Sequence, residues 1–171
     1  MGYYGIAYWM PGSYTPILGG VSRRLRYFFC RHIFKNCGKN VNIERKANFG
    51  SGLDIEIGDE SGLGINCSLP SNTKIGKYVM MGPNCYILPH NHNFSRTDIP
   101  MCKQGLSSKM QTIIEDDVWI GRDVLMTPGR IIKKGSIIAG GCVLCKNFPS
   151  FSIVGGNPSK LIRSRIDETK L

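Results

Sequence analysis

Two histidines lie close together in a polar part of the chain, in the run His90-Asn91-His92-Asn93. An imidazole titrates near neutral pH, so either histidine could take a proton from a substrate hydroxyl as a general base. The spacing could also supply two metal ligands, but a catalytic zinc usually needs three protein ligands, and His32 is the only other histidine. We therefore expect a base and no metal site. The competing role for either histidine is a hydrogen bond to a backbone carbonyl.

A six-residue repeat runs through most of the rest of the chain. Large apolar residues return at the first position of each unit in two in-phase runs, 57–91 and 114–148. These residues are Ile57, Leu63, Leu69, Ile75, Met81 and Ile87, then Ile114, Ile120, Met126, Ile132, Ile138 and Leu144. This period fits neither a helix nor a simple alternation, and is the signature of a parallel β-helix. We expect these side chains to point inward, and Cys67, Cys85 and Cys142 at position five to fill the core.

Glycine occupies the second position of several units. These glycines are Gly58, Gly64, Gly76, Gly82 and Gly121. Because glycine adopts backbone conformations that cost other residues energy, we expect these positions to supply turns. Position six should face outward if position one faces inward, and Trp119 stands at position six of its unit.

Residues 90–112 break the phase between the two runs. This segment, the excursion loop, is polar and contains both His90 and His92. A long excursion from a rigid scaffold usually has a function. We therefore place the candidate site at this loop.

The two ends of the chain lack the repeat. Residues 1–40 are expected to form an aromatic arm and an amphipathic helix over residues 20–36, which covers the open first coil with its apolar side and exposes its arginines. The apolar positions of that helix are Val21, Leu25, Phe28, Phe29, Ile33 and Phe34. Residues 41–152 form the β-helix with its excursion loop. Residues 153–171 close the other end, with a short helix indicated by Leu161, Ile162 and Ile166. We expect one domain overall.

The chain has 171 residues and a formal charge of +10, and no acidic residue precedes Glu44. Such a charge suits a phosphorylated cofactor or an anionic membrane surface, or it serves solubility alone. A nucleic-acid partner is not expected, because no aromatic and basic platform or known motif is present. No signal peptide and no stretch of about 20 apolar residues is evident, and the seven cysteines are odd in number and scattered. These features favour a cytoplasmic protein with free thiols.

Three further segments carry a resemblance to a known family. They are Ile-Glu-Asp-Asp-Val-Trp-Ile-Gly at 114–121, Ala-Gly-Gly-Cys-Val-Leu-Cys-Lys at 139–146 and Ile-Val-Gly-Gly-Asn-Pro-Ser-Lys-Leu-Ile-Arg at 153–163. Over residues 38–165 the chain resembles the hexapeptide-repeat acyltransferases, and its His-Asn-His loop resembles their sugar and xenobiotic O-acetyltransferase branch. The resemblance implies an all-β solenoid coiled as a left-handed parallel β-helix. It also implies a homotrimer that binds acetyl-coenzyme A in clefts between subunits.

The resemblance also implies roles for particular residues. His92, which follows Asn91 at the start of the loop, matches the catalytic base of the family, and His90 competes for that role. Three sets of candidates remain: cofactor-binding Trp119, Gly140 and Gly141; phosphate-binding Lys146, Lys160 and Arg163; and acceptor-binding Asn84, Tyr86 and Asn93. The competing roles are an interface aromatic for Trp119, coil corners for the glycines, a turn residue for Asn84 and solvated surface charges for the basic residues.

The function expected from these features is O-acetylation of a sugar hydroxyl with acetyl-coenzyme A. The basic helix indicates a saccharide of capsule or envelope polysaccharide synthesis, and contact with the inner face of the membrane. Two other hypotheses stay open at this point. One is acetylation of a xenobiotic such as a streptogramin or chloramphenicol, and the other is a non-catalytic β-helix that serves assembly or binding.

Overall fold

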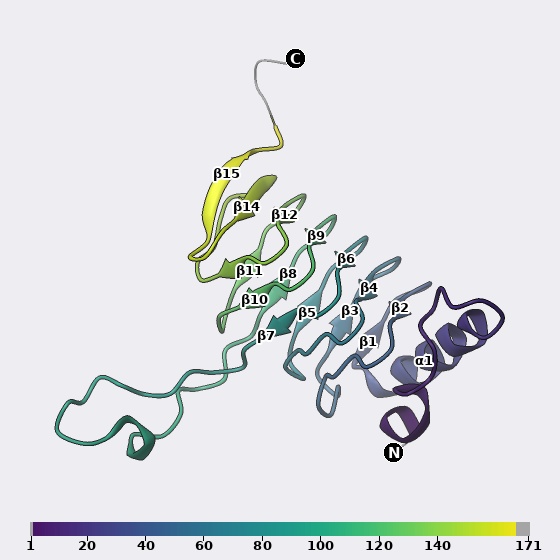
Figure 1. The fold of residues 1–171 in the computed structure, drawn as a ribbon, viewed down its shortest axis with the longest axis horizontal. Helices are drawn as coiled ribbons and strands as arrows, with labels where there is room; N and C mark the ends of the chain where they lie inside the picture. Colours follow the sequence, from purple (N-terminus) through teal and green to yellow (C-terminus); the bar gives the residue numbers. More distant parts are fainter. Residues whose placement is uncertain (1, 167–171) are drawn as a thin grey trace.

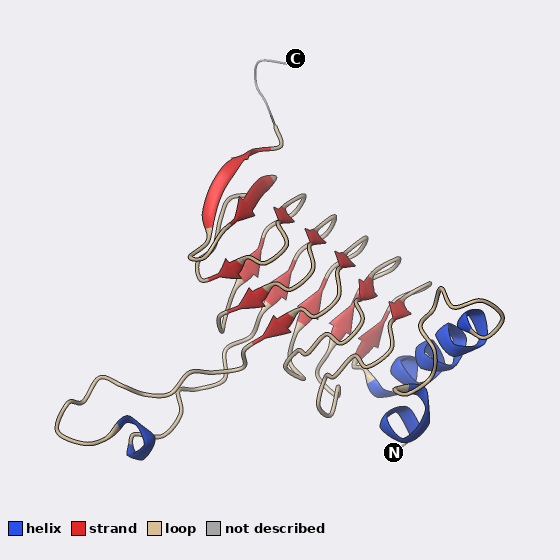
Figure 2. Ribbon diagram, in the orientation of Figure 1, coloured by secondary structure: helices blue, strands red, loops and turns tan. Residues whose placement is uncertain are grey.

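A computed structural model of the chain describes residues 2–166 and has the form of a solenoid with α1 (Gly19–Ile33) at one end (Figure 1). A regular coil consists of three strands of two residues joined by tight corners, as the short arrows of Figure 2 show. Eighteen residues complete a regular coil, because Glu56 pairs in parallel with Lys74 and Ile113 with Ile131. The spacing of three six-residue units per coil therefore agrees with the repeat in the sequence.

Stacking of the coils produces three faces, which the chain visits in the order 1, 2, 3. Face 1 consists of β1 (Asn36–Cys37), β3 (Glu56–Ile57), β5 (Lys74–Ile75), β8 (Ile113–Ile114) and β11 (Ile131–Ile132). Face 2 consists of β2 (Asn42–Ile43), β4 (Gly62–Leu63), β6 (Met80–Met81), β9 (Trp119–Ile120), β12 (Ile137–Ile138), β14 (Ser152–Gly155) and β15 (Lys160–Ser164). Face 3 consists of β7 (Tyr86–Ile87), β10 (Leu125–Met126) and β13 (Val143–Leu144), preceded by bridges that join Asn48, Ser68 and Tyr86.

The core is the column of side chains enclosed by the three faces. All of the first-position residues of the repeat are buried, and Ile120 and Met126 have no exposed surface. Cys67, Cys85 and Cys142 are buried beside them, as expected from their place at position five. Burial of one large aliphatic side chain contributes about 1.5–3 kcal/mol, so this column is the main source of stability of the coils.

The glycines at position two do not serve the purpose expected from the sequence. Gly58, Gly64, Gly76, Gly82 and Gly121 are absent from the residues with positive φ. They are needed because successive coils approach closely there: a Cβ built on Gly58 or Gly82 would lie 2.7 Å from backbone atoms of the next coil. The expectation that these glycines supply turn conformations is therefore wrong, and close packing of the backbone is the reason for them.

The left-handed conformations lie instead at the corners between faces. The corner between faces 2 and 3 is a stack of Asn66, Asn84, Asp123 and Gly141. The φ angles of these four residues lie between 56° and 70°. Asparagine, aspartate and glycine tolerate this region better than other residues. The residue types at these corners are thus dictated by backbone geometry.

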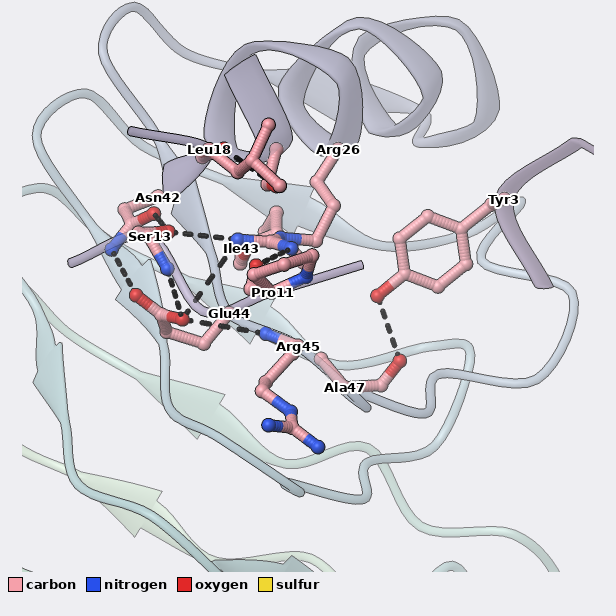
Figure 3. A network of polar contacts seen from close by, with 11 residues as sticks. Tyr3, Pro11, Ser13, Leu18, Arg26, Asn42, Ile43, Glu44, Arg45 and Ala47 are labelled. Atoms are coloured by element: carbon pink, nitrogen blue, oxygen red, sulfur yellow. Dashed lines mark hydrogen bonds and ion pairs between the residues drawn. The ribbon is translucent and has the colours of Figure 1, made fainter. Parts of the chain in front are cut away.

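Helix α1 covers the first coil, as predicted, but with a different side. Ser22, Arg26 and Cys30 are buried, whereas Val21 and Phe28, which were expected to pack inward, are more than half exposed. The helix is turned about its axis relative to the expected orientation because Arg26 forms hydrogen bonds below it. The guanidinium donates to the carbonyls of Ile43 and Pro11 and to the Ser13 hydroxyl (Figure 3). The expectation that all arginines of this helix face solvent is wrong.

The N-terminal arm packs on the first coil and on α1. It begins with the short helix η1 (Tyr3–Ala7), from which the buried Tyr3 hydroxyl donates to the Ala47 carbonyl at 2.9 Å. Farther along, the Ser13 amide donates to the Glu44 carboxylate at 3.0 Å, so the arm, α1 and the first coil share one polar network (Figure 3).

The C-terminal end differs from the expectation of a helix. Residues Lys160–Ser164 form β15, which pairs antiparallel with β14 and extends face 2. Pairing with β14 satisfies backbone groups that a bare last strand would expose. Leu161 and Ile162 are exposed, so their spacing reflects no buried helical side, and the predicted C-terminal helix is wrong for the described residues. Within residues 2–166 no helix has the length and apolar composition that crossing a bilayer requires.

Candidate active site

The excursion loop leaves the solenoid at the corner between face 3 and face 1, after β7 and before β8. Lys74 pairs with Ile113, 39 residues later instead of the regular 18, so the loop adds 21 residues without disturbing the register of the coils. In Figure 1 it projects away from the body and carries the short 3-10 helix η2 (Met101–Lys103) near its tip. The loop therefore presents its side chains at a distance from its own coils.

The two arms of this loop run antiparallel and are held together around the histidines. His92 forms an antiparallel β-bridge with Leu106. The backbone on either side of His92 is held as well, because the Ser107 amide donates to the Asn91 carbonyl and the Asn93 amide donates to the Gly105 carbonyl. His92 itself is exposed, whereas His90, nearer the base of the loop, is half-buried. The imidazole of His92 is thus supported by a fixed backbone and is open to a ligand.

Asn93 has a structural role in this arrangement. Its side-chain amide donates to the carbonyls of Gln104 and Leu106, at 3.1 and 3.2 Å. Both of its N–H bonds are used within the loop, so Asn93 positions His92, and only its amide oxygen is left for the acceptor contact that the sequence predicted.

Trp119 lies on face 2 with half of its surface exposed, in agreement with its position in the repeat. Its strand neighbours in register are Met80 on one side and Ile137 on the other. Met80 is also largely exposed. The sequence reasoning missed Met80, although it stands at position six of its unit like Trp119 and could have been found by the same count. Together these side chains give face 2 an apolar strip on which a ligand can lie.

A hollow of about 310 Å³ continues this strip toward the N-terminal coils. Its floor is open because Gly62 has no side chain, and its walls include Met80, Tyr14 and the buried Glu44. Tyr14 comes from the N-terminal arm and is 89% exposed. No pattern in the sequence indicates this hollow, because it depends on how the arm lies over the first coils.

Asn84, Gly140 and Gly141 lie at the corner between faces 2 and 3. The side-chain amide of Asn84 donates to Asp123 at 2.8 Å and accepts from Asn66 at 3.1 Å, so it belongs to a ladder along the corner. The Gly141 amide donates to the Arg122 carbonyl at 2.9 Å, and its φ of 70° is that of a corner residue. Asn84 and Gly141 thus have structural roles at this corner, and Gly140, just before Gly141, is exposed.

The other candidate residues are spread around the last coils. Tyr86 projects from β7 on face 3 with 47% of its surface exposed. Lys146 follows β13 and lies 5.5 Å from the ring centroid of Phe148, while Lys160 and Arg163 extend from β15. Among residues 2–166, none of these three basic side chains forms an ion pair. Their charges are therefore open to an anionic ligand.

Cys142 and Cys145 are separated by two residues, in a Cys-x-x-Cys arrangement, and have different surroundings. Burial raises the pKa of the Cys142 thiol, which belongs to the core. A hydrogen bond between the Ser159 hydroxyl and Sγ of Cys145, at 3.3 Å, holds the pKa of Cys145 below its usual value. In the part of the chain that the structure describes, no three His, Cys, Asp or Glu side chains are grouped as metal ligands.

The histidines and Trp119 lie on opposite sides of the coil. The loop with His92 leaves the corner between faces 3 and 1, and that corner is opposite face 2, which carries Trp119 and the hollow. In a prism with three sides, the two groups cannot face each other within one chain. Chemistry that uses both groups needs residues from two copies of the chain.

Comparison with known proteins gives a consistent result. A putative acetyltransferase of Saccharomyces cerevisiae is 35% identical over 135 residues, 78% of this chain and 67% of that protein. A galactoside O-acetyltransferase of Lactococcus lactis is 30% identical over 143 residues, 81% of this chain and 67% of that protein. A solved structure of a hexapeptide-repeat acetyltransferase of Vibrio cholerae, complexed with acetyl-coenzyme A, has a TM-score of 0.73 at 28% identity and covers 83% of this chain and 77% of that one. The chain belongs to the hexapeptide-repeat acetyltransferase family.

Membership in this family confirms three predictions made from the sequence: the family itself, the left-handed parallel β-helix and an acyltransferase enzyme. No family model matches the chain. The matched region spans 58% of a putative acetyltransferase of Schizosaccharomyces pombe and 67% of the two relatives above.

The named activities of other hexapeptide-repeat relatives point to different acceptors. A putative lipopolysaccharide biosynthesis O-acetyltransferase of Escherichia coli is 26% identical over 169 residues, 86% of both chains. A probable macrolide acetyltransferase of Lysinibacillus sphaericus is 32% identical over 136 residues, 76% of this chain and 70% of that protein. The family is thus shared by sugar-directed and antibiotic-directed proteins.

Proposed function

We propose that the protein transfers the acetyl group of acetyl-coenzyme A to a hydroxyl group of a saccharide. The proposal rests on two features of a chain of the acetyltransferase family: an exposed, backbone-supported His92 on the excursion loop, and an apolar strip with a hollow on face 2. The role of each residue in the site is part of the proposal.

In the proposed reaction the acceptor oxygen attacks the thioester carbonyl carbon directly. A C–O bond forms and the C–S bond breaks, while His92 takes the hydroxyl proton and returns it to the departing thiolate. The products are an acetyl ester and coenzyme A. Asn93 and the bridge to Leu106 hold the backbone that carries the imidazole. His90, half-buried at the base of the loop, is the second candidate for the base.

The cofactor residues fit a ligand that is apolar in its arm and anionic at its nucleotide end. Trp119 offers an exposed aromatic wall for the pantetheine arm, and Gly140 offers a backbone donor at the neighbouring corner. Lys160, Arg163 and Lys146 provide positive charge near the last coils for the phosphates. When bound, acetyl-coenzyme A supplies the activated acetyl group, and these side chains bind and orient it.

We also propose that the active site lies between two subunits of a homotrimer. The loop of one subunit would bring His92 to face 2 of the next, because His92 cannot reach Trp119 of its own chain. Cyclic assembly repeats the same contact three times and leaves no free site. Exposed apolar residues on the loop, including Phe94 and Met101, are consistent with burial against a neighbouring subunit.

A saccharide of envelope synthesis is the acceptor that we favour. Tyr14 gives the hollow an exposed aromatic surface against which a sugar ring can pack. The relative that matches over 86% of both chains is named for lipopolysaccharide biosynthesis. A macrolide or another xenobiotic is the second candidate, favoured by the 32% identity to the macrolide acetyltransferase. We place the enzyme in the cytoplasm, at the inner face of the membrane, where a lipid-linked saccharide would be available.

A panel of acceptors tests this proposal. We expect thiol release from acetyl-coenzyme A to depend on a saccharide, free or lipid-linked, and to stay at background with chloramphenicol, a streptogramin and a macrolide. Mass spectrometry of the saccharide should show the gain of one acetyl group. If only an antibiotic stimulates thiol release, the acceptor is that antibiotic and not a saccharide. If the protein does not bind coenzyme A, the enzymatic proposal is contradicted and a binding module is favoured.

A further inference from the structure

One side of α1 is turned away from the solenoid and combines apolar and basic side chains. We call it the outer stripe and define it by Val21, Arg24, Phe28 and Arg31. These residues recur at spacings of three and four, so they lie along one line of the helix, and all of them are exposed. Val21 and Phe28 expose 55% and 56% of their surface. In the structure as described, the outer stripe has no covering element.

Ile17, just before the helix, adds an unusual feature to this surface. Its φ is +67°, a left-handed conformation that is costly for a β-branched residue. Its side chain is 96% exposed. The turn that contains Ile17 is held by backbone hydrogen bonds, from the Gly19 amide to the Thr15 carbonyl and from the Leu18 amide to the Pro16 carbonyl. This turn presents Ile17 and the half-exposed Leu18 to the surroundings, and their exposure is accounted for when both enter an apolar environment beside the outer stripe.

A hollow of about 300 Å³ borders the outer stripe and shares Arg24 with it. Its lining consists of Gly20, Arg23, Arg24, Tyr27, Asn40 and Val41. A Cβ at Gly20 would meet no atom within 4 Å, so the hollow is open at this end. Arg23 is fixed because it donates to the Asn40 side chain at 2.6 Å. Two guanidinium groups around an open hollow match the size and charge of a phosphate group.

The charge of the surrounding chain indicates what kind of partner fits the outer stripe. No acidic residue precedes Glu44, and neither Arg24 nor Arg31 forms an ion pair within the part of the chain that the structure describes. A second copy of the same basic stripe would be repelled. An anionic bilayer instead offers phosphates to the arginines and an acyl boundary to the apolar side chains.

We propose that the outer stripe and its hollow dock the protein on the surface of an anionic lipid bilayer. Ile17, Val21 and Phe28 enter the boundary between headgroups and acyl chains, while Arg23 and Arg24 hold lipid phosphates in the hollow. The solenoid then stands with α1 on the membrane and β15 at the far end, which Figure 1 shows to be opposite α1. This docking does not depend on the proposed acetyl transfer.

Sedimentation with lipid vesicles tests the proposal. The unmodified protein should sediment with vesicles of mixed phosphatidylglycerol and phosphatidylcholine, and not with phosphatidylcholine alone, and binding should weaken as salt is added. We expect Arg24→Gln with Arg31→Gln to lower the partition coefficient by more than about tenfold, and Val21→Ser with Phe28→Ser to lower it similarly. Gly20→Leu, which fills the hollow, should weaken binding to anionic vesicles without changing net charge.

A matched control separates this surface from net charge. Lys77→Gln with Lys134→Gln removes the same two charges from exposed positions outside the outer stripe and outside the excursion loop. If this control loses as much binding as the arginine pair, or if the serine pair and Gly20→Leu bind like the unmodified protein, the docking surface is wrong. Acetyl transfer to a water-soluble saccharide should be unchanged in all of these variants, so a failure of docking can be told from a failure of the proposed chemistry. Circular dichroism and thermal melting verify the fold of each variant.

Discussion

Replacement of His92 by alanine is expected to lower kcat for acetyl transfer by a factor of about 10²–10⁴, because a positioned base contributes an acceleration of that size. The KM for acetyl-coenzyme A should change little, since His92 does not belong to the surface proposed to bind the coenzyme. His92 is exposed and its side chain has no bond that supports the loop, so the fold should survive. Steady-state kinetics with the best saccharide of the panel measures the effect.

His90→Ala is the matched control for this prediction. His90 lies in the same loop, two residues away, and is half-buried at its base. We expect it to retain most of the activity. If His90→Ala instead shows the larger loss and His92→Ala keeps full kcat, the base has been assigned to the wrong residue. If both variants keep full activity, the excursion loop does not supply the base.

Replacement of Arg26 by methionine is expected to lower the free energy of unfolding by about 3–5 kcal/mol. The Arg26 side chain is wholly buried, and one of its Nη atoms lies 3.9 Å from the Glu44 carboxylate, whose side chain is 8% exposed. Its three hydrogen bonds join α1 to the N-terminal arm and the first coil (Figure 3). The variant leaves Glu44 without its cation and two carbonyls without their donor. Urea unfolding at neutral pH measures the loss.

The same network predicts a dependence of stability on pH. Burial raises the pKa of Glu44, but hydrogen bonds from Ser13 and Asn42 and the charge of Arg26 outweigh it and hold the pKa below its usual value. A carboxyl group whose pKa is lowered by folding stabilises the protein above its unfolded pKa, and this contribution is lost as the pH falls through the folded pKa. The free energy of unfolding should therefore drop between neutral pH and about pH 3, with part of the drop due to Glu44.

Glu44→Gln is the control for the predicted loss of stability in Arg26→Met and for the predicted dependence of stability on pH. Glutamine can still accept from the Ser13 amide but cannot ionise, so this variant should lose only about 1–2 kcal/mol at neutral pH. It should also show a weaker dependence on pH than the unmodified protein. An Arg26→Met variant as stable as the unmodified protein, or an unchanged pH profile for Glu44→Gln, would show that the buried pair does not fasten the helix to the coil.

Much of the solenoid could be predicted from the sequence because one physical constraint governs it. An inward side chain at every sixth residue must be apolar, so the buried column, the exposure of Trp119 and the break at the excursion loop all follow from counting. The resemblance to the family added the hand of the coil, which the spacing of residues does not determine. The same count could also have identified Met80 beside Trp119.

The features that the sequence did not predict depend on contacts between residues that are far apart in the sequence. Arg26 is buried because Ile43, Pro11 and Ser13 receive its hydrogen bonds, and nothing in the helical pattern indicates those acceptors. Leu161 and Ile162 belong to a strand because β14 offers an open edge. Asn84 stands at a corner, where its φ is 59° and its side chain donates to Asp123 of the next coil. In each case tertiary contacts outweigh local pattern.

The central claim is that His92 of one chain works with face 2 of another, and subunit complementation tests it most directly. His92→Ala lacks the base, while Trp119→Glu places a negative charge on the proposed coenzyme wall and removes the aromatic surface. Each variant alone should be nearly inactive. Co-expressed in equal amounts and purified as mixed trimers, they should recover about a third of the sites, because each mixed trimer has one contact that combines an intact loop from one chain with an intact face from its neighbour. Mixed trimers with no more activity than the two variants kept apart would contradict a site shared between chains.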